Sequence, residues 1–177
     1  MSRLNKIITK TGDSGMTNLV SRDVHKSNPI IECIGAIDEA NSFIGHARNT
    51  LVSELSEFAA VLDSIQNNLF DLSADLICGT NKVNQEYIKI LEEQANKANE
   101  SLGPLTSFIL PKGSSSSIHV ARAVVRRAER AFWAYAQDEK EYNSDPGVYL
   151  NRLSDLLFII CRVINQSEKE ELWQRLK

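Results

Sequence analysis

The sequence predicts an all-α protein, a five-helix up-and-down bundle, and two observations lead to that prediction. The chain has 177 residues but only eight glycines and four prolines, about half the usual share, which leaves few turns for a sheet of many short strands. Apolar residues recur every three or four positions in five segments, the spacing of helices that bury one face. The length suits one domain over residues 1–177, with a nonhelical segment at 1–28 and the bundle at 29–177.

Each expected helix is a stripe of apolar residues that ends where helix-breaking residues gather. The first stripe is interrupted by a polar residue, Asn41, and the second begins at Leu55. The stripes are Ile30–Ile44, Leu55–Leu76, Ile88–Ala98, Ile118–Tyr135 and Leu150–Ile164, and the breaks are expected at 49–53, 79–84, 103–114 and 138–147, the last with an Asp-Pro-Gly turn signal at 145–147. Connections this short favour antiparallel neighbours in a left-handed bundle with shallow crossing angles.

Charge and composition exclude several classes of partner. Lys and Arg total 20 against 23 Asp and Glu, a net charge of −3, so no overall basic field attracts nucleic acid. The apolar run around Leu156–Cys161 is far shorter than the roughly 18 residues of a membrane span. Cys33, Cys78 and Cys161 lack C-x-x-C spacing, which favours free thiols over a disulfide or zinc site. Since residues 1–6 also show no targeting segment, we expect a cytoplasmic protein.

The nonhelical segment contains TKTGDSGMT at 9–17, a loop suited to a polyphosphate. Gly12 and Gly15 permit backbone angles closed to other residues, and Lys10 contributes a cation among three threonine hydroxyls. The loop does not match the G-x-x-x-x-G-K-[ST] pattern, and no helical stripe follows it. The residues alone leave two interpretations, a phosphate-binding loop or a polar surface hairpin with a glycine turn.

The expected fourth helix carries HVARAVVRRAER at 119–130. Arg122, Arg126 and Arg130 are four residues apart, so they form a column along the helix. The column lies next to the core stripe, which predicts half-buried guanidinium groups that need anionic partners. The alternative is a solvated basic face. The polar residues that could pair with the column are Asp38, Glu39, Asn151 and Asp155.

Common catalytic and metal motifs are missing from the sequence. No Glu-x-x-His pair, G-x-S-x-G or H-E-x-x-H occurs. His25, His46 and His119 are isolated in the sequence, which favours structural roles. We therefore expect no protein-bound metal site and no catalytic dyad.

Five sequence blocks together resemble the PduO-type ATP:cob(I)alamin adenosyltransferases. They occur in the family's order and span nearly the whole chain, and the last two are the most specific. The blocks are TKTGDSGMT at 9–17, IGAIDEANSFIG at 34–45, FILPKGS at 108–114, HVARAVVRRAER at 119–130 and YLNRLSDLLF at 149–158. The resemblance implies a five-helix bundle with ferritin-like packing and an N-terminal nucleotide-binding loop, assembled as a homotrimer with active sites between subunits.

The resemblance also assigns roles to individual residues. It implies that ATP is bound by Thr9, Lys10, Thr11, Gly12, Thr17, Asn18, Lys26, Arg126, Arg127, Glu129, Arg130 and Asn151. The catalytic set that it implies is Phe108, Asp38, Arg122 and Arg126. Asp38 and Arg122 are expected to pair across the subunit interface, and Phe108 is expected to lie against the corrin and keep cobalt free of its lower axial ligand. Lys112 stands where the family usually has glycine, so the loop loses a position of free backbone geometry.

The reaction implied by the resemblance transfers the 5′-deoxyadenosyl group of ATP to the Co(I) of a reduced corrinoid and releases triphosphate. Its expected ligands are ATP, cob(I)alamin and Mg²⁺, and the candidate protein partners are a reductase and an adenosylcobalamin-dependent enzyme. The rival hypothesis is a noncatalytic interaction module whose arginine column docks an acidic protein. ATP protection against thermal unfolding distinguishes the two, because a ligand that binds the folded state stabilises it.

Overall fold

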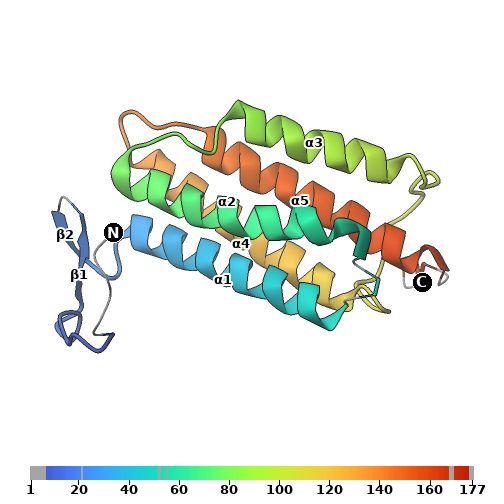
Figure 1. Ribbon diagram of the computed structural model, residues 1–177, viewed down its shortest axis with the longest axis horizontal. Helices are drawn as coiled ribbons and strands as arrows, with labels where there is room; N and C mark the ends of the chain where they lie inside the picture. Colours follow the sequence, from blue (N-terminus) through green and yellow to red (C-terminus); the bar gives the residue numbers. More distant parts are fainter. Residues whose placement is uncertain (1–6, 21, 52, 55, 168–169, 176–177) are drawn as a thin grey trace.

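The computed structural model of the chain describes residues 7–20, 22–51, 53–54, 56–167 and 170–175. The five predicted helices are confirmed (Figure 1). They are α1 (Pro29–Thr50), α2 (Ala59–Cys78), α3 (Gln85–Asn99), α4 (Ser116–Gln137) and α5 (Asp145–Ile164). Two short 3₁₀ helices, Ser56–Phe58 and Asn165–Ser167, adjoin α2 and α5. No helix in this described part of the chain is long and apolar enough to cross a membrane.

Some helix boundaries differ from the sequence-based expectation. Asp145, Pro146 and Gly147 were expected in a turn, yet they form the first turn of α5. Proline suits that position because its missing N–H has no partner there in any helix, and the Asp145 N–H donates to Asn143 Oδ1 at 3.0 Å. Leu55, the expected first residue of the second stripe, lies outside the described residues, and α2 itself begins at Ala59 after the 3₁₀ turn.

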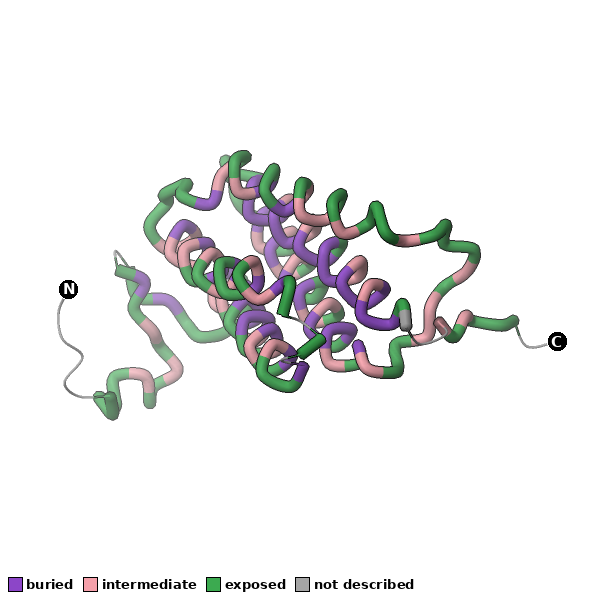
Figure 2. Tube along the Cα trace, turned by 45° about the vertical axis from the view of Figure 1, so that its right-hand side comes forward, coloured by how far each residue is buried: buried purple, intermediate pink, exposed green. Residues whose placement is uncertain are grey.

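Helix packing produces one apolar core that all five helices share. α1 packs against α4 and α2, while α5 packs against α4 and α3, and buried residues line the inward faces of the helices (Figure 2). Asn41, the polar residue of the first stripe, is buried between α1 and α2. Its Nδ2 donates to the Gln66 carbonyl at 3.1 Å, and Gln66 Nε2 donates to the Asn41 carbonyl at 3.2 Å. The first bond offsets the cost of burying the Asn41 Nδ2 group, whereas Asn41 Oδ1 is buried without a hydrogen-bond partner among the described residues.

A small antiparallel hairpin precedes the bundle. Its strands are β1 (Met16–Leu19) and β2 (Arg22–His25), with Met16 opposite His25. Leu19 and Val24 pack with Ile30 in a second apolar cluster, which places the hairpin beside the start of α1 (Figure 1). The described hairpin therefore begins at the end of the TKTGDSGMT segment and leaves its first seven residues as a loop.

Candidate functional site

A pocket of about 490 Å³ lies between the hairpin, α1 and α2. Thr17, Asn18 and Lys26 contribute polar groups from the hairpin side, and Asp38 contributes a carboxylate from α1. The remaining lining is mostly apolar: Leu19, Ile31, Ile34, Gly35, Ile37, Asn41, Leu69, Phe70, Ser73 and Ile77. An apolar pocket with a few polar groups on its rim is typical of small-molecule sites. Four of the residues predicted from the sequence thus meet in one place.

The loop beside this pocket folds back on the hairpin. Lys26 Nζ donates to the Gly12 carbonyl at 2.8 Å, and the Lys26 N–H donates to the Gly15 carbonyl at 2.8 Å. A Cβ at Gly12 would lie 2.8 Å from Lys26 Nζ, so a side chain there would displace the lysine. Lys10 has a φ of 62°, a left-handed conformation that is strained for a residue other than glycine. The Thr9 and Thr11 hydroxyls are 2.9 Å apart. Lys26, directly after β2, thus ties the exposed loop that carries Lys10 to the end of the hairpin.

The arginine column on α4 is half-buried at one position only. Arg122 is partly buried, as predicted, but Arg126 and Arg130 are exposed, so the prediction was wrong for them. A spacing of four residues advances about 40° beyond a full helical turn, which rotates the column away from the core stripe. Arg130 Nη1 donates to the Arg126 carbonyl at 3.0 Å. The guanidinium that pairs with Glu39 of α1 belongs to Arg127. The column therefore presents two cations to solvent.

Arg122 and Asp38 have different surroundings in the described chain. The Arg122 guanidinium is 5.7 Å from the centre of the Phe158 ring on α5, a favourable cation–π arrangement. Its Nε is buried and has no hydrogen-bond partner within the described part of the chain. His119 contacts the same ring, and burial, with a smaller effect from Arg122, lowers its pKa. Asp38 is exposed and faces the pocket. The two charges do not form an ion pair within the described chain.

The predicted residues Asn151 and Glu129 do meet, between α5 and α4. Asn151 Nδ2 donates to Glu129 Oε1 at 3.2 Å, and Arg152 Nη1 donates to Asn151 Oδ1 at 3.0 Å. Arg152 in turn donates through Nε to Glu92 of α3 at 2.7 Å. Burial raises the pKa of Asp155 against the opposing effect of Arg152 and Arg126. Sequence reasoning missed Arg152 and Glu92, although Arg152 stood inside the YLNRLSDLLF block.

Phe108 lies on the loop between α3 and α4, and its side chain is 79% exposed. Its ring contacts Trp173 edge to face, with centroids 6.4 Å apart. Residues 107–110 run antiparallel to 171–173: the Trp173 N–H donates to the Phe108 carbonyl at 2.7 Å and the Leu110 N–H to the Glu171 carbonyl at 2.9 Å. Trp173 was not predicted from the sequence, because this pairing joins segments that are far apart along the chain.

Lys112 does not occupy the special backbone position of this loop. The left-handed residue is its neighbour, Gly113, with a φ of 78°, and Lys112 is absent from the described residues with positive φ. The Lys112 ammonium forms an ion pair with Glu171. The expectation that lysine costs the loop a conformationally free position was therefore wrong, because the position that requires glycine is retained.

The described chain divides the predicted ATP-binding residues between two places. The hairpin lies at the end of the bundle where α1 begins, whereas the α3–α4 loop and the C-terminal segment lie at the opposite end (Figure 1). The pocket beside the hairpin is not lined by Arg126, Arg130 or Asn151. No group of three or more His, Cys, Asp or Glu able to hold a metal occurs within the described ranges. Cys33, Cys78 and Cys161 are free thiols.

The described elements define a five-helix bundle with a small hairpin that borders a pocket. The chain belongs to the cobalamin adenosyltransferase family, whose model matches residues 7–164. It is 44% identical to the corrinoid adenosyltransferase of Mycobacterium tuberculosis H37Rv over 97% of this chain and 94% of the relative. It is 40% identical to that of Bacillus subtilis 168, over 90% and 86%.

The chain is also similar to solved structures of PduO-type ATP:corrinoid adenosyltransferases. A variant PduO-type ATP:corrinoid adenosyltransferase from Lactobacillus reuteri, complexed with cobalamin and ATP, is 30% identical with a TM-score of 0.87, covering 97% of this chain and 98% of that chain. Another variant of that protein, complexed with ATP, is 32% identical with a TM-score of 0.87, covering 95% and 100%.

Proposed function

We propose that this chain transfers the 5′-deoxyadenosyl group of ATP to the Co(I) of a reduced corrinoid, giving adenosylcobalamin and triphosphate. Family membership supports the activity, and the relatives solved with cobalamin and ATP support both substrates. The observation that carries the proposal is the combination, in one bundle, of a lysine-bearing glycine loop beside a pocket and an arginine helix joined to Asn151. A noncatalytic interaction module would require neither feature.

The chemistry suits a protein without a catalytic dyad. Co(I) attacks the ribose 5′ carbon, so a cobalt–carbon bond forms while the C5′–O bond breaks and triphosphate leaves with the electron pair. No proton has to move, and the protein's task is to align the reacting atoms and stabilise charge on the leaving group. Lys10, Arg126 and Arg130 are exposed cations suited to that task.

We propose that ATP enters as its Mg²⁺ complex. Mg²⁺ prefers phosphate and water oxygens, with few protein ligands. The donor set of the described residues fits this arrangement, since it holds no cluster of three or more His, Cys, Asp or Glu. The metal would then neutralise part of the triphosphate charge. Lys10, Arg126 and Arg130 would stabilise the remaining negative charge.

A homotrimer with sites between subunits would bring the divided ATP-binding residues together. The loop with Lys10 and the hairpin end with Lys26 of one subunit would face the next subunit on the side of Arg126, Arg130 and Asn151. Two observations support this arrangement: Asp38 is exposed at the pocket, and Arg122 Nε is buried without a partner among the described residues. Asp38 would then pair with Arg122 of the next subunit and satisfy both charges.

Phe108 is proposed to lie against the lower face of the corrin. It is a large apolar side chain in an exposed position, so it can exclude a ligand from cobalt without any polar chemistry. Loss of the lower ligand would ease reduction of Co(II) to Co(I). We also propose that a reductase supplies the electron and that another enzyme consumes the product. The reducing cytoplasm is the proposed location of the reaction.

An absorbance assay with ATP and chemically reduced cob(I)alamin tests the proposed function. We expect the spectrum of the cobalt–carbon bond to appear only when ATP and the protein are both present. Failure to form that bond, in a protein that ATP protects against thermal unfolding, would contradict the transfer reaction. Absence of any ATP protection would instead favour the interaction module.

A further inference from the structure

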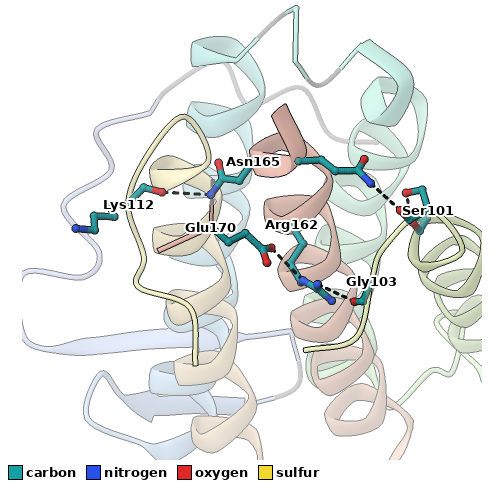
Figure 3. A network of polar contacts seen from close by, with 8 residues as sticks. Ser101, Gly103, Lys112, Arg162, Asn165 and Glu170 are labelled. Carbon is teal, nitrogen blue, oxygen red and sulfur yellow. Dashed lines mark hydrogen bonds and ion pairs between the residues drawn. The ribbon is translucent and has the colours of Figure 1, made fainter. Parts of the chain in front are cut away.

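The end of α5 joins three segments that are far apart in the sequence (Figure 3). They are the start of the α3–α4 loop at 101–103, the end of that loop at 112–115, and the C-terminal segment from Glu170. The joining side chains are Arg162, Asn165 and Gln166. None of these contacts belongs to the hairpin pocket or to the arginine column, so the mechanism described above leaves them without a role.

Arg162 connects the start of the loop to the C-terminal segment. The residue is only 8% exposed, and a buried guanidinium needs partners to offset its desolvation. Its Nη2 donates to the Gly103 carbonyl at 3.0 Å, and its Nε pairs with Glu170 Oε1 at 3.1 Å (Figure 3). Both partners lie outside the helices. The Arg162 guanidinium therefore binds two segments that lie outside the helices.

Asn165 holds the other end of the loop. It is 5% exposed; its Oδ1 accepts the Ser115 N–H at 3.2 Å, and its Nδ2 donates to the Lys112 carbonyl at 3.4 Å. These two partners flank Gly113, whose left-handed backbone turns the chain toward α4. The amide thus bridges the turn, and Gln166 Nε2 adds a bond to the Ser101 carbonyl at 2.6 Å.

Phe108 lies between the two held ends of the α3–α4 loop, 101–103 and 112–115. Its exposed side chain is not set by the bundle core, and its backbone carbonyl accepts a bond from Trp173 of the C-terminal segment. That segment begins at Glu170, the partner of Arg162. The loop that carries Phe108 is thus joined to the segment held by the Arg162–Glu170 ion pair, and its end is held by Asn165.

We propose that Arg162 and Asn165 are positioning residues for the corrinoid, which set the place of Phe108 through the loop and through the C-terminal segment. The inference rests on the proposed function, because it gives Phe108 its contact with the corrin. It adds residues that touch neither substrate and that lie in the last turn of α5 and directly after it, at the helix end opposite to the hairpin (Figure 1).

Hydrogen exchange tests the mechanical part of the proposal without any activity. In Glu170→Ala, the Leu110 and Trp173 amides that join the two segments should exchange about tenfold faster, as expected for the loss of a charge-assisted bond. Glu170 lies outside the helices, so amides in α1 and α4 should be unchanged. Asp63→Ala is the matched control, since it removes the Arg48–Asp63 pair, 3.6 Å, between α1 and α2. Unchanged exchange at Leu110 and Trp173 would overturn the proposal.

Kinetics and spectroscopy test the link to the corrinoid. Glu170→Ala and Asn165→Asp should each lower kcat/KM for cob(II)alamin plus reductant by about tenfold while KM for ATP stays unchanged. Arg162→Lys should lose less than Arg162→Gln, because lysine retains a charged donor. The absorption spectrum of cob(II)alamin bound with ATP should show more of the lower-ligated form in the impaired variants.

Two outcomes distinguish a failure of the positioning role from a failure of the proposed function. Equal losses for ATP and corrinoid, or none, in a folded variant would show that Arg162 and Asn165 are ordinary structural residues. A wild-type chain that forms no cobalt–carbon bond would overturn the proposed function and the corrinoid role with it. The hydrogen-exchange experiment would still decide whether Arg162 holds the loop.

Discussion

Arg122 and Arg126 occupy the same side of α4 but differ in what surrounds their guanidinium groups. Arg122 is partly buried over Phe158, whereas Arg126 is exposed one turn later. A buried guanidinium is committed to partners near it, while an exposed one remains available to a ligand. This difference supports the two proposed roles, a fixed contact between subunits for Arg122 and a contact with triphosphate for Arg126.

Arg126→Ala should leave the bundle folded and reduce kcat/KM about ten- to several-hundredfold, because a charge-assisted contact to phosphate strengthens as the leaving group forms. Steady-state kinetics with cob(I)alamin measure the loss, and circular dichroism reports the fold. Lys89→Ala is the control, since Lys89 is an exposed cation of α3 paired with Glu93 at 3.7 Å. Equal activity of Arg126→Ala and the wild type would remove Arg126 from the site.

Phe108→Ala should retain ATP affinity and lose adenosylation, most severely when the assay starts from cob(II)alamin and includes reduction. The side chain is exposed and lies outside the apolar core, so its removal should not change the midpoint of thermal unfolding. Titration with ATP and assays from both oxidation states provide the comparison. A parallel fall in ATP binding and corrinoid turnover would make Phe108 a packing residue.

Asp75→Asn should lower the free energy of unfolding by about 1–3 kcal/mol, because the carboxylate accepts several hydrogen bonds. Its Oδ2 accepts the Lys82 and Val83 N–H groups, both at 2.9 Å, and its Oδ1 accepts from the Thr80 hydroxyl. Urea unfolding measures the loss. The control is Asp71→Asn, an exposed partner of Lys82 at 3.3 Å whose loss should cost little.

The effect of Asp75 should also depend on pH. Burial raises the pKa of this carboxyl, but the bonds from Thr80, Val83 and Lys82 outweigh burial and hold it below its ordinary value of 3.8. Its contribution to stability is therefore complete above that ordinary value and is lost as pH falls through the lowered pKa of the folded state. The difference in free energy of unfolding between wild type and Asp75→Asn should become smaller in acid. A difference that does not change with pH would show that the ionisation of Asp75 does not contribute to stability.

At the scale of elements, α5 starts under a close-packed aromatic cluster. A Cβ at Gly147, in its first turn, would lie 2.6 Å from atoms of both Phe132 and Trp133 of α4. Those rings contact each other and Tyr142, which precedes α5. Glycine at this position lets two helices approach, so the Asp-Pro-Gly segment begins a helix and also fixes how α5 packs on α4.

Gly147→Ala should destabilise the protein by about 1–3 kcal/mol through overpacking, although alanine favours helix. Gly35→Ala on α1 is the matched control, because a Cβ there meets no atom within 4 Å. The control should raise the free energy of unfolding by roughly 0.5–1 kcal/mol. Thermal and urea unfolding of both variants measure the difference, and a stabilised Gly147→Ala would mean that the rings move aside without cost.

At the scale of the whole molecule, the pocket beside the hairpin and the exposed arginines of α4 do not form one site in the described chain. A single subunit would therefore bring to one triphosphate either Lys10 or the two arginines, but not all three cations that the proposal requires. Pairing through a cyclic trimer would complete each site with residues of two chains.

Mixing two impaired variants tests that arrangement. Lys10→Ala and Arg126→Ala should each lose at least about nine-tenths of their activity, and unfolding and reassembling them together should restore wild-type activity at roughly a quarter of the sites. The reason is that some interfaces then carry both intact residues. Light scattering must first give a trimeric mass. A trimer whose mixture recovers nothing would show that both residues reach one ATP from the same chain.

The helices and the composition of the candidate site could be predicted from the sequence because both are local properties. An apolar stripe such as Ile118–Tyr135 determines a helix and its buried face within a few turns. The loop with Lys10 and Gly12 and the helix with Arg126 are likewise short segments whose chemistry is visible in their residues. The Asp-Pro-Gly segment at 145–147 shows where local prediction fails: it was expected in a turn but begins α5. Proline fits a turn and the start of a helix equally well.

Only the tertiary structure decided which of these residues meet. Arg130 is exposed because the helix rotates its column away from the core, and Glu39 pairs with Arg127 because α1 packs on α4. The contacts of Trp173 with Phe108, and of Arg162 with Gly103, join segments with no shared period or spacing. Such contacts depend on how all helices pack together, and no local stretch of sequence contains that information.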